Sequence, residues 1–155
     1  MPLKTGIYPP WWTADITLYN RDIAADGTVS WYKTLLGGCY FTNATATSTS
    51  LAAASDKAES DTSICRIRES ESYRNPVEWS ALDEAGKTSY FTLYPEDIIV
   101  PGHVSDEIDE TGESGLLSSA LLEKHDRMGA FRVSEVSECT GHMVGSPHYK
   151  ALGVV

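Results

Sequence analysis

The residues best suited to hold a metal ion lie near the C-terminal end of the sequence. Cys139 and His142 form a C-x2-H pair, and His148 follows in the same stretch. A structural zinc site needs four ligands, usually supplied as two close pairs. Cys39 and Cys65 stand alone, so the second pair is missing. We therefore expect no metal site and expect His148 to hydrogen-bond in the turn before it. A zinc-dependent enzyme using Cys139, His142 and His148 is the weaker alternative.

Acidic side chains are concentrated in the stretch 105–115, which holds five carboxylates: Asp106, Glu107, Asp109, Glu110 and Glu113. An EF-hand calcium loop needs an oxygen ligand at its third position and glycine at its sixth. A loop starting at Asp106 puts Ile108 third, and one starting at Asp109 puts Ser114 sixth, so neither register fits. We interpret the stretch as a solvated acidic loop, with a functional acidic surface as the alternative.

The sequence lacks the local patterns that mark common catalytic sites. It contains no G-x-S-x-G for a serine nucleophile and no papain-like cysteine context. It also contains neither G-x-x-x-x-G-K-[ST] nor G-x-G-x-x-G for binding phosphate groups. We therefore expect no catalytic and no cofactor-binding residues, and a protein that is not an enzyme.

The charge balance restricts the classes of partner. The 155 residues include 12 Lys and Arg against 22 Asp and Glu, a net charge of −10, with 41% hydrophobic residues. This balance argues against gripping nucleic acid by its phosphates, which needs clustered basic residues, but it suits a protein past which DNA slides. No stretch approaches the ~20 apolar residues of a membrane span, and the N-terminus resembles no signal peptide. Three sparse cysteines indicate free thiols and synthesis in the cytoplasm.

Hydrophobic alternation predicts the strands that must position these residues. Ile16 and Leu18 alternate with Thr17 and Tyr19, and an Asp26-Gly27 turn separates this strand from a second over 28–35. Gly37-Gly38 breaks the chain. Further short strands are expected at 39–41, 64–69, 88–94 and 98–100, at 131–136 with a bulge near 135–136, and at 149–155. A short helical piece is expected in 76–85, and a helix capped by Ser118 or Ser119 that ends at Gly129.

These elements predict a single, mainly β domain over residues 1–155, a small barrel or sandwich of short strands with one helix and long protruding loops. Residues 1–14 form an N-terminal extension. Residues 42–63, almost all Thr, Ala, Ser and acidic, form an arm that orders against a partner or a poorly ordered surface loop. The large aromatic residues are expected to supply buried area, in the core or as interface anchors: Trp11, Trp12, Trp31 and Tyr32.

Four motifs stand in order along the chain: Asp15-Ile-Thr-Leu-Tyr-Asn20; Tyr90-Phe-Thr-Leu93 followed by Glu96-Asp-Ile-Ile-Val100; Val104 to Ile108; and Gly145-Ser-Pro-His148. This order resembles a family of small proteins from phages and prophages of Gram-positive bacteria. Its members carry D-I-T-L-Y-N, Y-F-T-L-x-x-x-D-x-I-V, G-x-V-x-x-E-I and G-S-P-H in the same order along the chain. The stretches 122–126 and 131–136 also fit the pattern. The aromatic opening 7–12 and the Thr/Ala/Ser stretch depart from it.

The resemblance implies a virion structural protein of the neck, of the head-completion or head–tail connector type, which forms a ring between portal and tail. Such a protein would associate with itself, with portal or adaptor proteins and with tail-side neck proteins, and double-stranded DNA would pass through the ring without sequence-specific binding. The segments 42–63 and 106–115 are its two candidate arms, the acidic one lining a channel that must not hold DNA. It would be made in the bacterial cytoplasm and reside in the virion, not in a membrane. The alternatives are a tail-completion or minor capsid protein, or a small acidic protein that binds a host factor.

Overall fold

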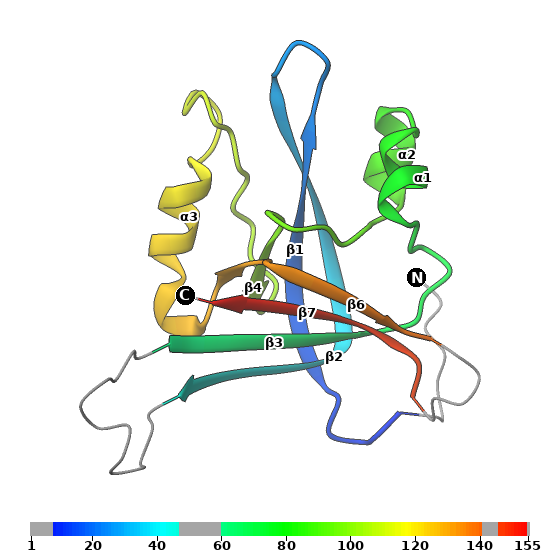
Figure 1. Ribbon diagram of the computed structural model, residues 1–155. Coiled ribbons are helices and arrows are strands. Elements are labelled where there is room, and N and C mark those ends of the chain that lie inside the picture. Colours follow the sequence, from blue (N-terminus) through cyan, green and yellow to red (C-terminus); the bar gives the residue numbers. More distant parts are fainter. Residues whose placement is uncertain (1–7, 47–59, 141–145, 155) are drawn as a thin grey trace.

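The structure is a computed structural model, and it describes residues 8–46, 60–140 and 146–154. Within these residues, seven antiparallel strands form one sheet that curls into a half-barrel in the order β5-β4-β1-β2-β3-β7-β6 (Figure 1). The strands are β1 (Ala14–Ile23), β2 (Val29–Ala46), β3 (Ser60–Arg68), β4 (Ile98–Pro101), β5 (Phe131–Arg132), β6 (Glu135–Cys139) and β7 (His148–Val154). The mainly β fold expected from the alternation of apolar residues is therefore confirmed.

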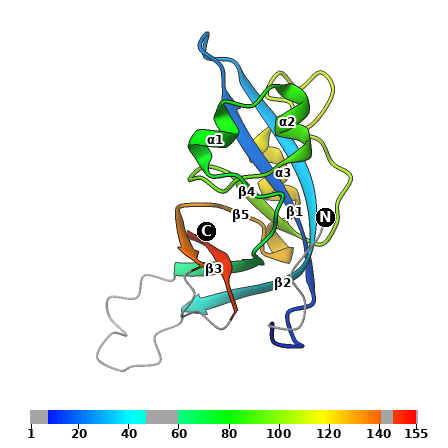
Figure 2. The ribbon, with the colours of Figure 1, turned by 90° about the vertical axis from the view of Figure 1, so that its right-hand side faces the viewer.

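The long strand β2 belongs to both halves of the sheet. Its first part pairs with β1, with Leu36 opposite Ile16, and its last part pairs with β3, with Tyr40 opposite Arg66. Between these parts the strand bends at Gly38, which has a φ of 64° that favours glycine. The Arg68 guanidinium closes the corner, since its Nε donates to the Gly38 carbonyl at 2.7 Å. The expected chain break at Gly37-Gly38 is therefore a bend inside one continuous strand, and the strands of the two halves run across each other (Figure 2).

A second corner brings the two ends of the sheet together. β5 pairs with β4, and β6 pairs with β7, yet only Val133 and Ser134 separate β5 from β6. The Val133 amide donates to the Asp97 carbonyl, and the Ser134 amide donates to the Leu152 carbonyl, both at 2.7 Å. The chain thus passes from one half of the sheet to the other at this point. The burial alternation of Phe131 and Val133 breaks at Ser134 and Glu135, next to the slip expected near 135–136, and this corner accompanies it.

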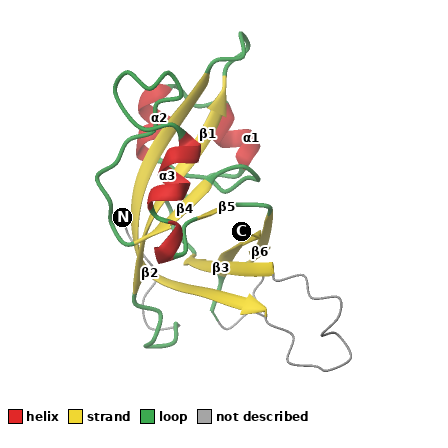
Figure 3. Ribbon diagram, turned by 90° about the vertical axis from the view of Figure 1, so that its left-hand side faces the viewer, coloured by secondary structure: helices red, strands yellow, loops and turns green. Residues whose placement is uncertain are grey.

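The core has two parts because β1 and β4 are covered on both faces. Ile16 and Leu18 point into the half-barrel with Ile99, while Tyr19 points to the other side. There Tyr19 and the neighbouring Ile98 and Val100 pack with Leu121 of α3 (Ser118–Lys124). The opposite faces predicted for Ile16 and Tyr19 are thus confirmed, and Figure 3 shows α3 lying along β1 and β4.

Two short helices flank the β1–β2 hairpin on the side away from α3 (Figure 1). They are α1 (Pro76–Ser80) and α2 (Glu84–Ser89). The Asn75 carboxamide oxygen caps α1 by accepting from the Glu78 amide, and the Asp83 carboxylate caps α2 by accepting from the Gly86 amide. The strand expected over 88–94 is therefore wrong, because the capped helix α2 takes its first residues. Phe91 retains only an isolated bridge to Tyr73.

The expectation of one helix is also corrected, since the described residues include three α-helices and a 3₁₀ turn at Asp126–Met128. The helix predicted to end at Gly129 is shorter, because α3 ends at Lys124 and the 3₁₀ turn follows it; Gly129, in the left-handed region at φ 96°, ends that turn. Its N-cap, however, is Leu117, and neither serine caps it. No helix in the described part of the chain has the length and apolarity to cross a membrane.

Two segments expected to lie outside the barrel belong to it. Residues 42–46 and 60–63 continue β2 and β3, with Thr42 opposite Ile64 and Ala46 opposite Ser60, because strand pairing satisfies the backbone whatever the side chains. The middle of the expected arm, 47–59, lies outside the described residues. In the expected N-terminal extension, Trp12 is only 6% exposed and meets the rings of Tyr40 and His148. Residues 1–7 lie outside the described part.

Candidate binding surfaces

The acidic stretch is a loop built by its own carboxylates. Asp109 accepts hydrogen bonds from the amides and hydroxyls of Thr111 and Ser114, which hold its pKa well below the usual range. Glu110 accepts from the Ser118 amide at the start of α3, at 2.7 Å. These bonds fold the loop onto itself and fasten it to the start of α3, while its role as an arm that reaches a neighbouring subunit stays a prediction.

Two further carboxylates of the loop pair with cations of the same chain. Asp106 lies 2.8 Å from both Lys124 Nζ and His125 Nε2, and these donors lower the pKa of Asp106. Glu107 lies 2.6 Å from Lys33 Nζ on β2. Glu113 is exposed. Most of the charge that the sequence places here is thus engaged in local structure, which weakens its assignment as a channel lining.

The four aromatic residues expected as interface anchors have different surroundings. Trp12 is buried within its own chain, so its assignment as an interface anchor is wrong. Trp31 packs against the core cluster under α3, and Tyr32 meets the Trp79 ring edge-on at 5.6 Å between centroids. Only Trp11 among the four is largely exposed, at 67%. Most of this aromatic area is therefore used inside the subunit.

The residues considered for zinc are only partly described. Cys139 and His148 are cross-strand partners on β6 and β7, while His142 lies outside the described residues. The His148 Nδ1 donates to the Ser146 carbonyl at 2.7 Å, as the sequence predicted. In the part of the chain that the structure describes, no three His, Cys, Asp or Glu side chains are grouped to hold a metal ion.

The first three ordered motifs pack against one another. Polar side chains of the first motif hydrogen-bond to the later two. Thr17 Oγ1 donates to the Gly102 carbonyl at 2.7 Å and accepts from the Val104 amide at 2.9 Å. Tyr19 Oη donates to the Asp106 carbonyl and Asn20 Nδ2 donates to the Thr92 carbonyl, both at 2.7 Å. The motifs are separate in sequence but form one framework. Their polar residues therefore have structural roles that the sequence alone did not reveal.

Asp97, within the second motif, is a buried carboxylate at the centre of this framework. It accepts hydrogen bonds from the Arg21 amide at 2.8 Å, from Asn20 Nδ2 at 2.9 Å and from the Tyr94 amide at 2.9 Å. Burial raises the pKa of Asp97 to about 7, although these donors and the Arg21 charge act to lower it. Asp97 thereby fixes a tight turn in which Glu96 has a φ of 84°, unusual for a residue other than glycine.

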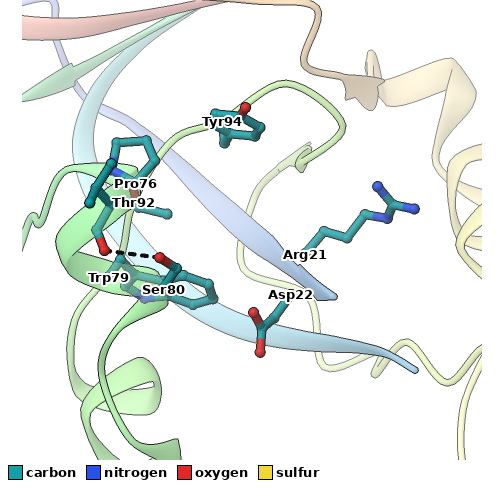
Figure 4. A pocket seen from close by; sticks show the side chains of 8 residues that line it. Arg21, Asp22, Pro76, Trp79, Ser80, Thr92 and Tyr94 are labelled. Atoms are coloured by element: carbon teal, nitrogen blue, oxygen red, sulfur yellow. Dashed lines mark hydrogen bonds between the residues drawn. The ribbon is translucent and has the colours of Figure 1, made fainter. Parts of the chain in front are cut away.

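A pocket of about 270 Å³ lies between α1 and the end of β1 (Figure 4). It is lined by Arg21, Asp22, Pro76, Val77, Trp79, Ser80, Thr92 and Tyr94. Asp22 is held by Lys87 Nζ at 2.9 Å, and the Trp79 indole donates to the Tyr90 carbonyl. Val77 is 80% exposed and Tyr94 is 58% exposed, so the rim of the pocket presents apolar surface to solvent.

A second depression, which we call the seam cleft, lies where the two ends of the sheet meet. The segment just before β4 and the segment just after β5 are hydrogen-bonded to each other. The last of these bonds runs from the Glu96 amide to the Val133 carbonyl. Beyond this bond a space of about 410 Å³ separates the two segments. It is lined by Tyr73, Pro76, Leu93, Tyr94, Pro95, Ser134, Glu135, Val136 and Glu138.

An adjoining hollow of about 360 Å³ shares Tyr73 and Glu138 with the seam cleft. Its other lining residues are Glu69, Arg74, Asn75, Glu78, Thr140 and Tyr149. The Tyr73 hydroxyl donates to Glu138 at 2.9 Å, and its ring stacks on Tyr149 with centroids 3.9 Å apart. None of these residues was expected as a site residue, and no local pattern in the sequence marks them.

Comparison with known proteins matches the chain to a family model. The model of a family described as "Family of unknown function (DUF6751)" matches residues 11–154. No curated protein and no solved structure matches the chain.

Proposed function

We propose that this chain, which belongs to the Family of unknown function (DUF6751), is a structural subunit of a phage virion at the neck between head and tail. In this role it is a head-completion or head–tail connector protein that forms a ring through which DNA passes. The ordered motifs support the proposal through their resemblance to small phage and prophage proteins. A small curled β-sheet with a projecting hairpin is also compatible with a ring subunit.

The observation that carries the proposal is exposed apolar surface at two separate places. Ile23 is 55% exposed near the tip of the β1–β2 hairpin, which projects beyond the two flanking groups of helices (Figures 1 and 2). Val77 and Tyr94 form the other exposed area, on the rim of the pocket beside α1. Subunits of a cyclic ring meet head to tail, so each must offer two different surfaces. In the proposed ring, the hairpin of one subunit contacts the pocket rim of the next.

The charge suits the same role without requiring the acidic loop to line the channel. With a net charge of −10, the subunit repels the phosphates of double-stranded DNA and so lets the duplex move through. The partners in this role are other copies of the chain, portal or adaptor proteins, and tail-side neck proteins.

The proposal is tested in virions produced by a strain that carries the gene. Mass spectrometry of purified particles should detect the protein, and cryo-electron microscopy should place it in a ring at the neck. Native mass spectrometry should show that Ile23→Asp loses ring assembly while Ile23→Val keeps it, with both variants folded by circular dichroism. A protein that is absent from virions and stays monomeric alone and with neck partners would refute the proposal.

The same experiments separate the alternative roles. A tail-completion or minor capsid protein would appear in the particle away from the neck. A small acidic protein that binds a host factor, an alternative based on the net charge of −10, would be absent from particles. It would instead form a salt-sensitive complex with one host DNA-binding protein.

A further inference from the structure

The seam cleft occupies the place where the curled sheet is missing one strand. β6 pairs with β7 along its whole length, from Glu135 opposite Leu152 to Cys139 opposite His148. Among the described residues no strand pairs with the other edge of β6, which is the last strand in the sheet order. Such an edge presents unpaired backbone N–H and C=O groups to whatever lies beside it. Here the cleft lies beside it, because residues 134–136 and 138 form one wall.

The opposite wall is poorly suited to pair with β6 across the gap. It includes Pro76 and Pro95, which have no backbone N–H to donate. Leu93 is buried in the core, whereas Tyr94 is 58% exposed at the rim. An extended segment entering the cleft would therefore pair with β6 on one side and pack against prolines and an aromatic ring on the other.

Carboxylates surround the cleft and the adjoining hollow. Glu135 and Glu138 lie on β6, and Glu78 lies on α1. None of these three forms an ion pair with a Lys or Arg side chain in the described part of the chain. Arg74, the basic residue that lines the hollow, lies over the Tyr90 ring at 4.1 Å and donates to the Tyr73 carbonyl at 2.8 Å. The surface is therefore complementary to basic side chains.

Aromatic rings strengthen the preference for cations. Tyr73 and Tyr149 stack on each other, and Glu138 holds the Tyr73 hydroxyl. Ring faces attract ammonium and guanidinium groups, most strongly where water is partly excluded. Burial raises the pKa of Tyr149 to about 12, and the nearby charges of Glu69 and Glu138 act in the same direction.

We propose that the seam cleft binds an extended segment of a partner protein that carries lysine or arginine side chains and pairs with the open edge of β6. Backbone pairing supplies affinity without regard to sequence, and the carboxylates and tyrosines select basic side chains at alternate positions. The proposal does not depend on a role in the virion neck, because it follows from the open edge, the cleft and the charge around it.

A random octapeptide library displayed on yeast, selected against the full chain, tests this binding mode. Selected peptides should be rich in β-branched residues and carry Lys or Arg at alternate positions. Their affinity, measured by calorimetry, should fall with rising salt. It should fall about fivefold in Glu138→Gln, as expected for removal of one partly exposed carboxylate–cation contact. Glu123→Gln makes the same charge change on α3 and should leave the affinity unchanged.

Hydrogen exchange identifies where the peptide lies. The amides of residues 135–139 should gain protection when a selected peptide binds. N-methylation of alternate peptide amides should abolish binding when the methylated set is the one that faces β6, and should not when it is the other set. A selection that yields no basic peptides would overturn the proposal. So would protection confined to another part of the chain, or equal affinities for Glu138→Gln and Glu123→Gln.

Discussion

The buried carboxylate of Asp97 makes the stability of this protein depend on pH in an unusual direction. Burial raises its pKa from an ordinary value of 3.8 to about 7, so the folded chain holds the proton more tightly than the unfolded chain. Between these two pH values the folded state binds more protons than the unfolded state. The free energy of unfolding should therefore fall as pH rises from about 4 to 7, and the loss should be complete above the folded-state pKa.

The expected magnitude follows from the same two pKa values. At about 1.4 kcal/mol for each tenfold change in proton affinity, the contribution of Asp97 should fall by about 3 kcal/mol between pH 4 and pH 7. Other carboxylates act in the opposite direction. The pKa values of Asp106 and Asp109 are lowered, so their contributions are present above the unfolded-state pKa and are lost as pH falls. Asp97→Asn removes only the first effect and keeps the shape of the side chain.

The assay is chemical denaturation of both proteins across this pH range, followed by circular dichroism. The unfolding free energy of the wild type minus that of Asp97→Asn should decrease by about 3 kcal/mol as pH rises from 4 to 7. The Arg21, Asn20 and Tyr94 donors oppose this effect, since each stabilises the ionised form. If they outweighed burial, the difference would grow with pH, and a growing or constant difference would refute our reasoning.

Three further predictions test the fold. Glu96→Gly should raise the unfolding free energy by about 1 kcal/mol, because glycine adopts the φ of 84° without strain. Glu96→Ala should not raise it, and parallel denaturant titrations measure both variants. Gly153→Ala should cost about 1–3 kcal/mol, since its Cβ would overlap the Phe131 ring. Phe131→Leu in the same chain should recover part of that loss in a double-mutant cycle. Ile99→Asp should prevent folding, as a buried charge without a partner is costly, and a native-like thermal transition would contradict the assignment of β4.

Local patterns in the sequence predicted several elements correctly. The alternation of Ile16 and Leu18 with Tyr19 identified the two faces of β1. Asp26 caps the turn between β1 and β2 by accepting from the Thr28 amide, and Gly129 ends the last helical turn. These predictions depend on side-chain periodicity and on turn chemistry, which act over a few residues. That range is sufficient to assign a mainly β fold class.

Two predictions failed because neighbouring residues do not determine strand pairing. Phe91 and Leu93 are buried as a strand would require, yet in the described part of the chain only the Tyr73 bridge to Phe91 forms there, and no ladder. Conversely, composition marked 42–63 as an arm, but residues 42–46 and 60–63 pair as strands. Backbone hydrogen bonds across a sheet form with little regard to side-chain type, so composition could not locate the ends of β2 and β3.

The sequence by itself determined the strand faces, the main turns, the mainly β class and the excess of negative charge. Only the tertiary structure joined Asn20 to Asp97 and placed Tyr73 beside Glu138 at the seam cleft. These contacts depend on strand order, register and the curl of the sheet, which are set by pairings between distant segments. No local pattern encodes such pairings, so neither the buried carboxylate nor the open edge of β6 was visible before the fold was known.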